Sequence, residues 1–318
     1  MDNEKIMMAK EELSAKLIEV AQTGDSMECA RLANYPYDAE LAIPEVITAI
    51  AKTASIDKGE DYEYFVVSPE TKVVYTITSG SINQTNVTPG THSDLTFSDI
   101  ESDQYYVYIS KILSAKYDAL KVKADTAMES LNRKEVKDVL ALLIAAAEGQ
   151  SNTYVNDSSD TAIDFAKLVE MVRSLARYGD KLVLISGADV TTDLILMDYN
   201  DNKNREVTLA KAGISQWIKI EGYQYTHSGT QTVLATDKAL VVASSDSQAN
   251  RCVDFVRRKV GDIEGAGEKE RVVIVTGPDM QVGATPKLAF GVVAFEQYGA
   301  VVTNPRCVAV YQNASVYS

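Results

Sequence analysis

The residues that most often carry out catalysis or bind metal ions are few and scattered in this chain of 318 residues. The two histidines, His92 and His227, fall in polar segments that are typical of surface loops. A zinc site needs cysteine and histidine ligands at short spacing, whereas Cys29, Cys252 and Cys307 are far apart. The sequence therefore predicts no metal site and no acid–base catalysis by histidine.

Serine chemistry has little support as well. Ser228 follows His227, but neighbours along a strand point to opposite faces, and the Gly-x-Ser-x-Gly motif does not occur. Ser186, Asp189 and Asp193 lie where a strand is expected to turn into a helix, a corner at which α/β enzymes often place catalytic groups. Helix capping explains Asp189 equally well. We expect no catalytic residue and no cofactor, and keep an α/β enzyme with a site near Ser186 and Asp189 as an alternative.

Two binding motifs are incomplete. Residues 198–202 imitate the start of a calcium loop, but Lys203 stands where the motif needs glycine and Leu209 where it needs glutamate. The glycine-rich run 261–269 lacks the Gly-Lys-Ser/Thr ending of a phosphate loop and precedes a strand instead of a helix. Both segments are interpreted as polar connections.

Composition limits the partners. The formal net charge of −14 disfavours a surface that neutralises phosphates, so we expect protein partners rather than sequence-specific binding to DNA. No apolar run of about 18 residues occurs, which predicts no membrane span. The N-terminus lacks the pattern of a signal peptide, and three distant cysteines suit reduced thiols in a cytosol.

Residues 116–148 organise the rest of the chain. Apolar residues three, four or five positions apart predict a helix far longer than the usual ~11–12 residues. The stripe changes phase between Leu131 and Val136, so a kink or short break is expected there. We interpret this helix as a spine that several layers share.

Residues 60–112 have a different pattern. Runs of aromatic and β-branched residues at 62–67, 73–78 and 105–109 flank the polar segment 79–94, which predicts a long hairpin with a polar tip. Such a ribbon is marginally stable alone and would leave its tyrosines in water. We therefore expect it to lie on a neighbouring copy of the chain. The candidate contact residues between subunits, in the ribbon and in the N-terminal arm, are Tyr62, Tyr64, Tyr75, Ile77, Tyr105, Tyr108, Tyr35 and Tyr37.

The other elements alternate between helix and strand. An amphipathic helix at 3–22 and a short helix begun near Pro44 are expected to form an arm that leaves the main body. Further helices are predicted at 160–178, from 189 to about 199, and at 245–260. Strands are predicted at 182–186, 217–225, 232–236, 239–243, 271–276, 287–295, 300–303 and 307–311, with a turn at 297–299.

This order of elements, together with the closing stretch 295–311 and the strand, Ser-Gly turn and helix of 181–196, resembles the major capsid protein of tailed bacteriophages. The resemblance implies an α+β chain with the Hong Kong 97-type capsid fold: a long spine helix, an extended β-hairpin loop, a peripheral core domain and an inserted axial α/β domain. The implied division is an N-terminal arm at 1–59, the extended loop at 60–112, the peripheral domain with the spine at 113–179, the axial domain at 180–270 and the returning strands of the peripheral domain at 271–318.

The resemblance also implies a function. The chain would be a structural protein, not an enzyme, that assembles in many copies, as hexamers and pentamers, into an icosahedral shell around the phage genome. Packaged DNA would be enclosed without sequence-specific binding, and no membrane would be involved. Scaffold, portal and decoration proteins are candidate partners, and the short arm after Met1 suggests that any scaffold is a separate protein. The expected location is the virion capsid, assembled in the host cytoplasm. An encapsulin-like nanocompartment that encloses cargo protein is the alternative within the same fold.

Overall fold

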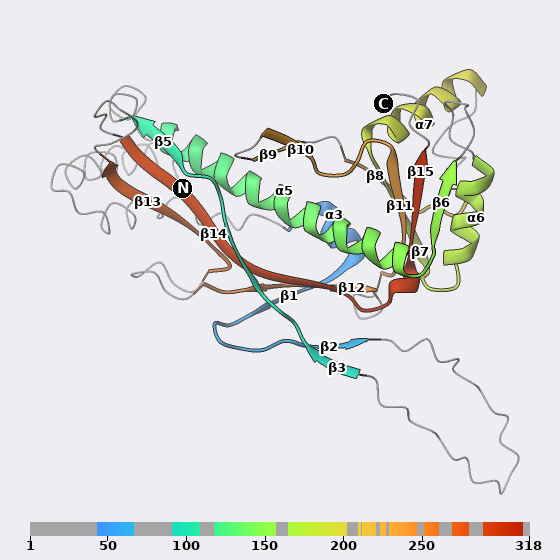
Figure 1. The fold of residues 1–318 in the computed structure, drawn as a ribbon, viewed down its shortest axis with the longest axis horizontal. Helices are drawn as coiled ribbons and strands as arrows, with labels where there is room; N and C mark the ends of the chain where they lie inside the picture. Colours follow the sequence, from blue (N-terminus) through green and yellow to red (C-terminus); the bar gives the residue numbers. More distant parts are fainter. Residues whose placement is uncertain are drawn as a thin grey trace, which may run out of the picture.

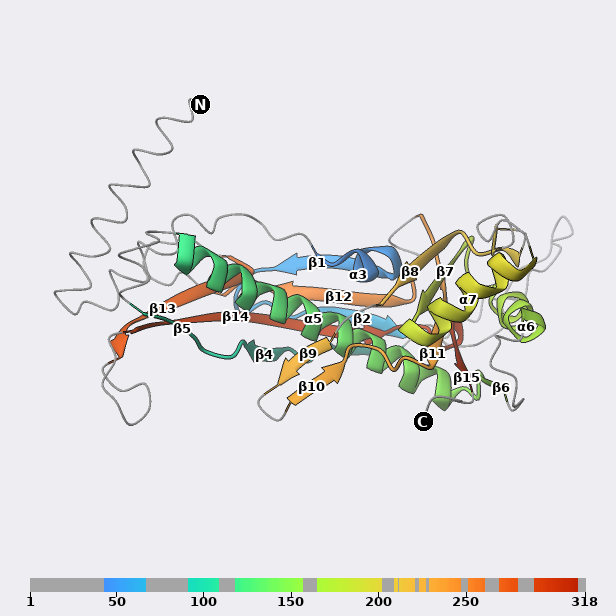
Figure 2. The same ribbon diagram turned by 90° about the horizontal axis from the view of Figure 1, so that it is seen from above.

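The computed structural model describes residues 43–66, 91–108, 118–156, 165–201, 209–210, 212–220, 223–226, 229–246, 251–260, 269–279 and 289–313. These residues form an elongated body with two sheets (Figure 1). The helix α5 (Asp118–Gly149) runs beside the larger sheet and reaches the smaller sheet at its C-terminal end, as the view from above also shows (Figure 2).

Helix α5 is continuous over 32 residues and runs straight in Figure 2, so the kink or short break expected between Leu131 and Val136 is wrong. The buried side of the helix passes through Leu131, Glu135 and Val139, which lie four positions apart. Glu135 is fully buried. The apparent change of phase arises because Glu135, the core residue at this step, is charged. A search for apolar residues therefore leaves it out of the buried stripe.

The larger sheet is built around the long strand β14 (Ala289–Val302). One edge of β14 pairs with β12 (Val253–Arg258) and then β13 (Arg271–Asp279), and the other pairs with β4 (Ser98–Glu101) and β5 (Tyr105–Tyr108). Strand β1 (Ala51–Ile56) extends the sheet by parallel pairing with β12. All the pairings of β14 are antiparallel.

Two sequence predictions in this sheet are wrong. The helix expected at 245–260 is replaced by β12, whose residues 253–257 are all buried, so its charged residues do not form a solvated helix face. The turn expected at 297–299 does not exist, because β14 runs through these positions. Gly299 serves close packing there: a Cβ would lie 2.8 Å from Leu95 Cγ and from the Thr96 carbonyl oxygen.

The smaller sheet has the order β6 (Thr153–Asn156), β15 (Val308–Asn313), β11 (Lys238–Ser244), β7 (Lys181–Ser186) and β8 (Gln216–Lys219). β11 is antiparallel to both β15 and β7, whereas the outer pairs β15–β6 and β7–β8 are parallel. The central strands read as continuous apolar runs, as expected for strands covered on both faces. Helices α6 (Phe165–Leu175) and α7 (Ala188–Asp201) contact β11, and the pair β9 (Tyr223–Thr226) and β10 (Gly229–Thr232) forms a separate ribbon.

The two sheets exchange strands along the chain. β12, inside the segment 180–270, belongs to the larger sheet, and β15, inside the segment 271–318, belongs to the smaller one. The short helix α3 (Glu45–Ile50) confirms the helix predicted after Pro44. It does not leave the body as an arm, because Ile47, Ile50 and Ala51 are fully buried in the core.

Candidate assembly site

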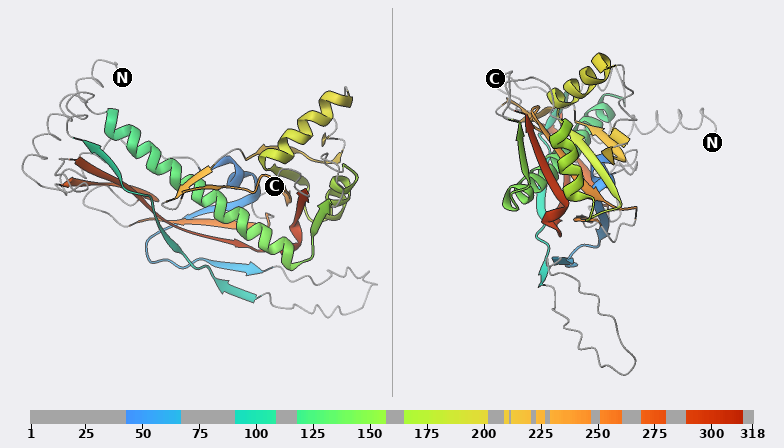
Figure 3. Two further views of the ribbon diagram at one scale, coloured as in Figure 1. Left: turned by 45° about the horizontal axis from the view of Figure 1, so that its top comes forward. Right: turned by 90° about the vertical axis from the view of Figure 1, so that its right-hand side faces the viewer.

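A two-stranded hairpin projects from the body on the side of the larger sheet opposite α5 (Figure 3). It consists of β2 (Glu63–Val66) and β3 (Thr91–Asp94), paired antiparallel from Glu63↔Asp94 to Val66↔Thr91. The pairing confirms a strand within 62–67, but its partner β3 lies in the segment 79–94 that was predicted as the polar tip. The prediction that 105–109 belongs to the ribbon is wrong, because β5 pairs with β14 in the larger sheet and buries Val107. Among the described strands, β2 and β3 pair only with each other. A ribbon of this kind gains little stability by itself and needs a surface to pack on.

The hairpin is tied to the sheet at its base. The Tyr62 hydroxyl donates a hydrogen bond to Asp254 Oδ2 at 3.1 Å, and the Lys52 ammonium lies 5.6 Å from the centre of the Tyr62 ring. Burial raises the pKa of Asp254, although Lys52 and the Tyr62 hydroxyl oppose this effect. Arg258 adds a bond from Nη2 to the Glu60 carbonyl oxygen at 2.6 Å. The root of the hairpin therefore has a fixed direction.

The predicted contact residues differ in location and in exposure. Tyr62 and Tyr64 are half-buried at the root, and the half-buried Tyr105 carries the Lys123 ammonium 5.7 Å from its ring centre. Tyr108 is 37% exposed, as is Tyr106, which the sequence analysis did not select. Tyr106 and Tyr108 share one face of β5 by strand alternation. Tyr75, Ile77, Tyr35 and Tyr37 lie outside the described residues. Contact of any of these residues with a neighbouring copy stays a prediction.

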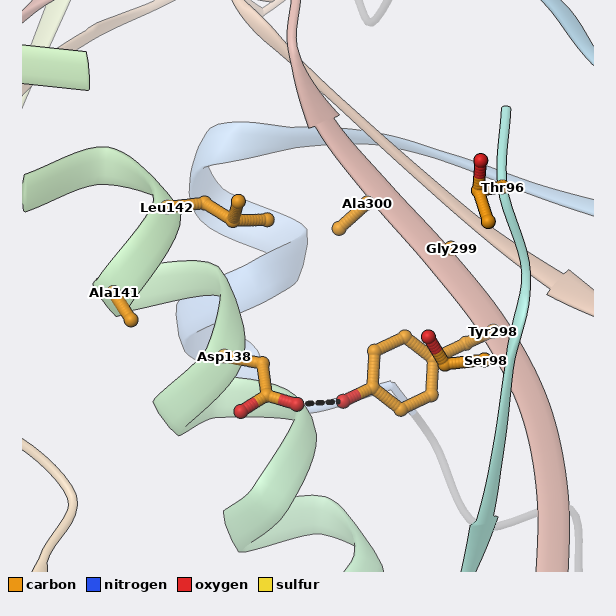
Figure 4. Close-up of a pocket in the computed structure, with 8 residues that line it drawn as sticks. All are labelled: Thr96, Ser98, Asp138, Ala141, Leu142, Tyr298, Gly299 and Ala300. Atoms are coloured by element: carbon orange, nitrogen blue, oxygen red, sulfur yellow. Dashed lines mark hydrogen bonds between the residues drawn. The ribbon is translucent and has the colours of Figure 1, made fainter. Parts of the chain in front are cut away.

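A groove of about 440 Å³ opens between α5, β14 and the segment that leads from β3 to β4 (Figure 4). In the groove, the Tyr298 hydroxyl donates a hydrogen bond to Asp138 Oδ2 at 2.6 Å, and the Lys134 ammonium lies 2.6 Å from Asp138 Oδ1. Burial and the bond to Asp138 raise the pKa of Tyr298 well above its usual value. Leu142, on the rim, is 41% exposed. The residues that line the groove are Thr96, Ser98, Asp138, Ala141, Leu142, Tyr298, Gly299 and Ala300.

Four charged side chains meet in the core where α5 crosses the larger sheet. Glu135 comes from α5, Arg257 from β12, Arg271 from β13 and Glu296 from β14, and all four are buried. Arg257 donates to Glu135 twice, from Nε to Oε1 at 2.8 Å and from Nη2 to Oε2 at 2.9 Å. Arg271 Nη2 lies 2.8 Å from Glu135 Oε2, and Arg271 Nε donates to Glu296. This ion cluster connects the helix to three strands.

The ion cluster contains a strained carboxyl group. Burial, and then the nearby charge of Glu135, raise the pKa of Glu296 to about 7, although Arg271 and Arg257 oppose the shift. Glu296 Oε1 is buried without a hydrogen-bond partner in the described part of the chain. Sequence reasoning missed the ion cluster because its members are separated by up to 161 positions in the chain, from Glu135 to Glu296.

The corner at Ser186 is built as part of the core. Ser186 is fully buried, and its Oγ accepts a hydrogen bond from Trp217 Nε1 at 2.7 Å and shares one with Thr191 Oγ1 at 2.8 Å. Asp193 is also buried, and this burial, together with the charge of Asp189, raises its pKa. The Ser186 hydroxyl thus satisfies a half-buried indole and a buried threonine, which is a structural use of the side chain.

No group of three or more side chains suited to a metal ion occurs in the part of the chain that the structure describes. None of the described helices is both long and apolar enough to cross a membrane.

No family model and no curated protein matches the sequence. Solved structures do match the fold. A structure from Microbacterium phage Oxtober96 aligns with a TM-score of 0.55 at 13% identity, covering 87% of this chain and 93% of that one. The capsid structure of Cyanophage P-SCSP1u aligns with a TM-score of 0.53 at 12% identity, covering 87% and 90% of the two chains. The chain has a phage capsid fold. A structure from Mycobacterium phage Bobi also aligns over 87% of this chain, with a TM-score of 0.51 at 13% identity.

Proposed function

We propose that this chain is a shell-forming subunit of the Hong Kong 97 type, the major capsid protein of a tailed bacteriophage. The observation that carries the proposal is the projecting hairpin β2–β3, rooted firmly in a body that has a phage capsid fold. An element with a fixed direction and with little packing of its own suits contact with a second copy of the chain.

The parts of the fold take distinct roles in this proposal. The helix α5 is the spine, and together with the larger sheet it forms the peripheral domain, to which α3 and β1 also belong. The smaller sheet with α6 and α7 forms the axial domain that meets other copies around the symmetry axes. The extended loop that lies on a neighbour is the part of 60–112 that contains β2 and β3, whereas β4 and β5 belong to the larger sheet. The tyrosines of β5 and the rim of the groove are further contact surfaces. With this division β12 would belong to the peripheral domain, whereas β15 and α6 would belong to the axial domain, although α6 lies in the segment 113–179 that was expected to be peripheral.

The acidic composition suits a container for DNA. A subunit with a formal net charge of −14 has no excess of positive charge with which to hold phosphates tightly. The shell would enclose the genome in the virion without reading its sequence, after assembly from hexamers and pentamers in the host cytoplasm. Scaffold, portal and decoration proteins are the partners that such a shell would take.

Electron microscopy of the purified chain, with the nucleic acid in any particles measured alongside, tests the proposal. We expect closed polyhedral shells, formed alone or with a co-expressed scaffold protein. Shells that enclose a cargo protein and no DNA, when isolated from the natural source, would instead support the encapsulin-like compartment. A chain that remains monomeric with every candidate scaffold would contradict both functions.

A hairpin variant tests the element that carries the proposal. Val66 and Thr91 are paired residues, so Asn-Gly in place of residues 67–90 closes β2–β3 with a two-residue turn. We expect a folded subunit with an unchanged circular dichroism spectrum that no longer forms stable shells. The double variant Tyr75→Ser/Ile77→Ser keeps the length of the loop, so it tests the contribution of these two apolar side chains separately from the contribution of loop length. Shells of unchanged yield from the shortened variant would overturn the role of the hairpin.

A further inference from the structure

Two buried cysteines lie at the places where the chain crosses between the sheets. Cys252 stands between β11 of the smaller sheet and β12 of the larger one, and Cys307 stands between β14 of the larger sheet and β15 of the smaller one. Both side chains are buried in the core, and both are free thiols in the structure. The two crossings are far apart in sequence.

The crossings lie side by side. The Cys252 carbonyl oxygen accepts a hydrogen bond from the Thr303 amide at 2.8 Å and another from the Asn304 amide at 3.4 Å. The Cys307 amide in turn donates to the Asn304 carbonyl oxygen at 3.2 Å, which closes a tight turn. The backbone of one crossing therefore rests directly on the turn that holds Cys307.

The two thiols differ in character. The Cys252 thiol donates to the Ala243 carbonyl oxygen at 3.5 Å. Its proximity to the Cys307 side chain lowers the pKa of Cys307 against the effect of burial, and the Asn304 side chain adds to this lowering. The interaction with Cys307, and then burial, raise the pKa of Cys252 well above its usual value. The thiolate is the reactive form of cysteine, so Cys307 is the thiol that reacts first, and Cys252 is placed beside it as a partner.

We propose that Cys252 and Cys307 are a redox-active pair that closes to an intramolecular disulfide at the junction of the two sheets. The oxidant that suits a buried thiol is a small peroxide such as hydrogen peroxide. The Cys307 thiolate attacks one peroxide oxygen, which forms a sulfenic acid and releases hydroxide. The Cys252 sulfur then attacks the Cys307 sulfur, the S–S bond forms, and the proton of the thiol and the sulfenic hydroxyl group leave as water. The two cysteines lose two electrons, which reduce the peroxide.

The disulfide would fasten one crossing to the other. The relative position of the two sheets depends on these crossings and on α5, which contacts strands of both sheets. A cross-link between residues 252 and 307 removes freedom from the unfolded chain and from any hinge motion at the junction. The expected result is a subunit whose two parts unfold together and at a higher temperature after oxidation.

The test uses the full chain with Cys29→Ser, which leaves only this pair of thiols. The folded protein is treated with hydrogen peroxide, alkylated in denaturant and digested with trypsin. We expect the peptide of residues 252–257 to be linked to the peptide of residues 307–318. We also expect a thermal midpoint that rises on oxidation and returns with dithiothreitol. In Cys252→Ser, dimedone should trap a sulfenic acid on Cys307, whereas in Cys307→Ser the remaining Cys252 should stay unlabelled.

Three results would overturn the proposal. One is full alkylation of both cysteines after peroxide treatment of the folded chain. Another is a linked peptide that appears only when the chain is oxidised in urea. The third is linkage between two different copies, detected as a dimer on a non-reducing gel of protein that was treated while folded.

Discussion

Glu135 is the residue at which α5 and the larger sheet converge. Its two carboxylate oxygens receive Arg257 and Arg271 from two different strands, and Glu135 has no exposed surface. Burying four charges is costly, and an apolar core of the same volume is often as stable. The ion cluster instead fixes the position of α5, because planar arginine–carboxylate pairing sets the register of the helix against the sheet.

Removal of Glu135 should therefore be severe. In Glu135→Ala, the two arginines lose their shared partner in the core, and we expect the free energy of unfolding to fall by about 3–5 kcal/mol, as for other broken buried pairs. Urea unfolding of the unassembled subunit measures this change. The matched control is Glu129→Ala on the same helix, whose pair with Arg133 is exposed and should be worth less than about 1 kcal/mol. Equal losses in the two variants would contradict the role of the ion cluster.

Glu296 should make stability depend on pH. Its pKa in the folded chain, about 7, lies above the ordinary value of 4.5, so the folded state holds a proton that the unfolded chain releases between these values. The stability from this proton is complete below pH 4.5 and is lost as the pH rises through 7. The slope from one such group is at most about 1.4 kcal/mol per pH unit.

Replacement by glutamine isolates this contribution. We expect Glu296→Gln to unfold with a smaller loss of stability between pH 5 and 8 than the parent chain, measured by urea titration at each pH. Glu101→Gln, an exposed position on β4 opposite Phe295, is the control and should keep the parental slope. Parallel pH profiles for the parent chain and Glu296→Gln would contradict the assignment.

At the scale of elements, β14 is the strand on which the larger sheet depends. It pairs with four other strands. Glu296 belongs to the ion cluster, Tyr298 lines the groove, and Gly299 allows the segment after β3 to approach the strand closely. Leu95 hydrogen-bonds to the Tyr62 carbonyl oxygen through its amide, so this segment is also part of the hairpin root. Packing at Gly299 thus affects the direction of the hairpin.

A methyl group at position 299 should disturb this packing. In Gly299→Ala the new Cβ would meet Leu95 Cγ and the Thr96 carbonyl oxygen at 2.8 Å, which forces the segment away from β14. We expect a loss of about 1–3 kcal/mol, typical of overpacking, and a lower yield of shells, because the hairpin root moves with the segment. Gly149→Ala is the control, since nothing lies within 4 Å of its added Cβ. A Gly299→Ala chain with parental stability would contradict the close approach.

At the scale of the whole molecule, the net charge should oppose the proposed assembly. Copies with a formal net charge of −14 repel one another, and this repulsion acts over the Debye length, which falls from about 10 Å in 0.1 M salt to about 3 Å in 1 M salt. We expect light scattering from assembling subunits to rise faster in 1 M than in 0.1 M sodium chloride. Sucrose at matched osmolality is the control for general effects of cosolutes and should not reproduce the acceleration. Slower assembly in high salt would show that opposite charges at the contacts outweigh the net repulsion.

The sequence by itself determined those features that depend on local pattern. The long helix, the strand and helix around Ser186, the buried strands of the smaller sheet and the start of the hairpin follow from periodicity and turn residues, and their order was enough to indicate a capsid fold. Net charge and the absence of clustered ligands are also properties of the sequence alone.

Tertiary structure decided what depends on distant partners. β12 resembles a helix in sequence because Asp254, Arg257 and Arg258 look solvated, yet Asp254 and Arg257 are buried. Asp254 and Arg257 are matched by Tyr62 and Glu135, which lie more than 100 positions away. Gln297–Gly299 resembles a turn, but Gly299 is needed for close approach. Glu135 interrupts the apolar stripe of α5, just as the charged residues of β12 concealed a buried strand. In both cases a buried charge is stable only with its partners, and these are brought together only by folding.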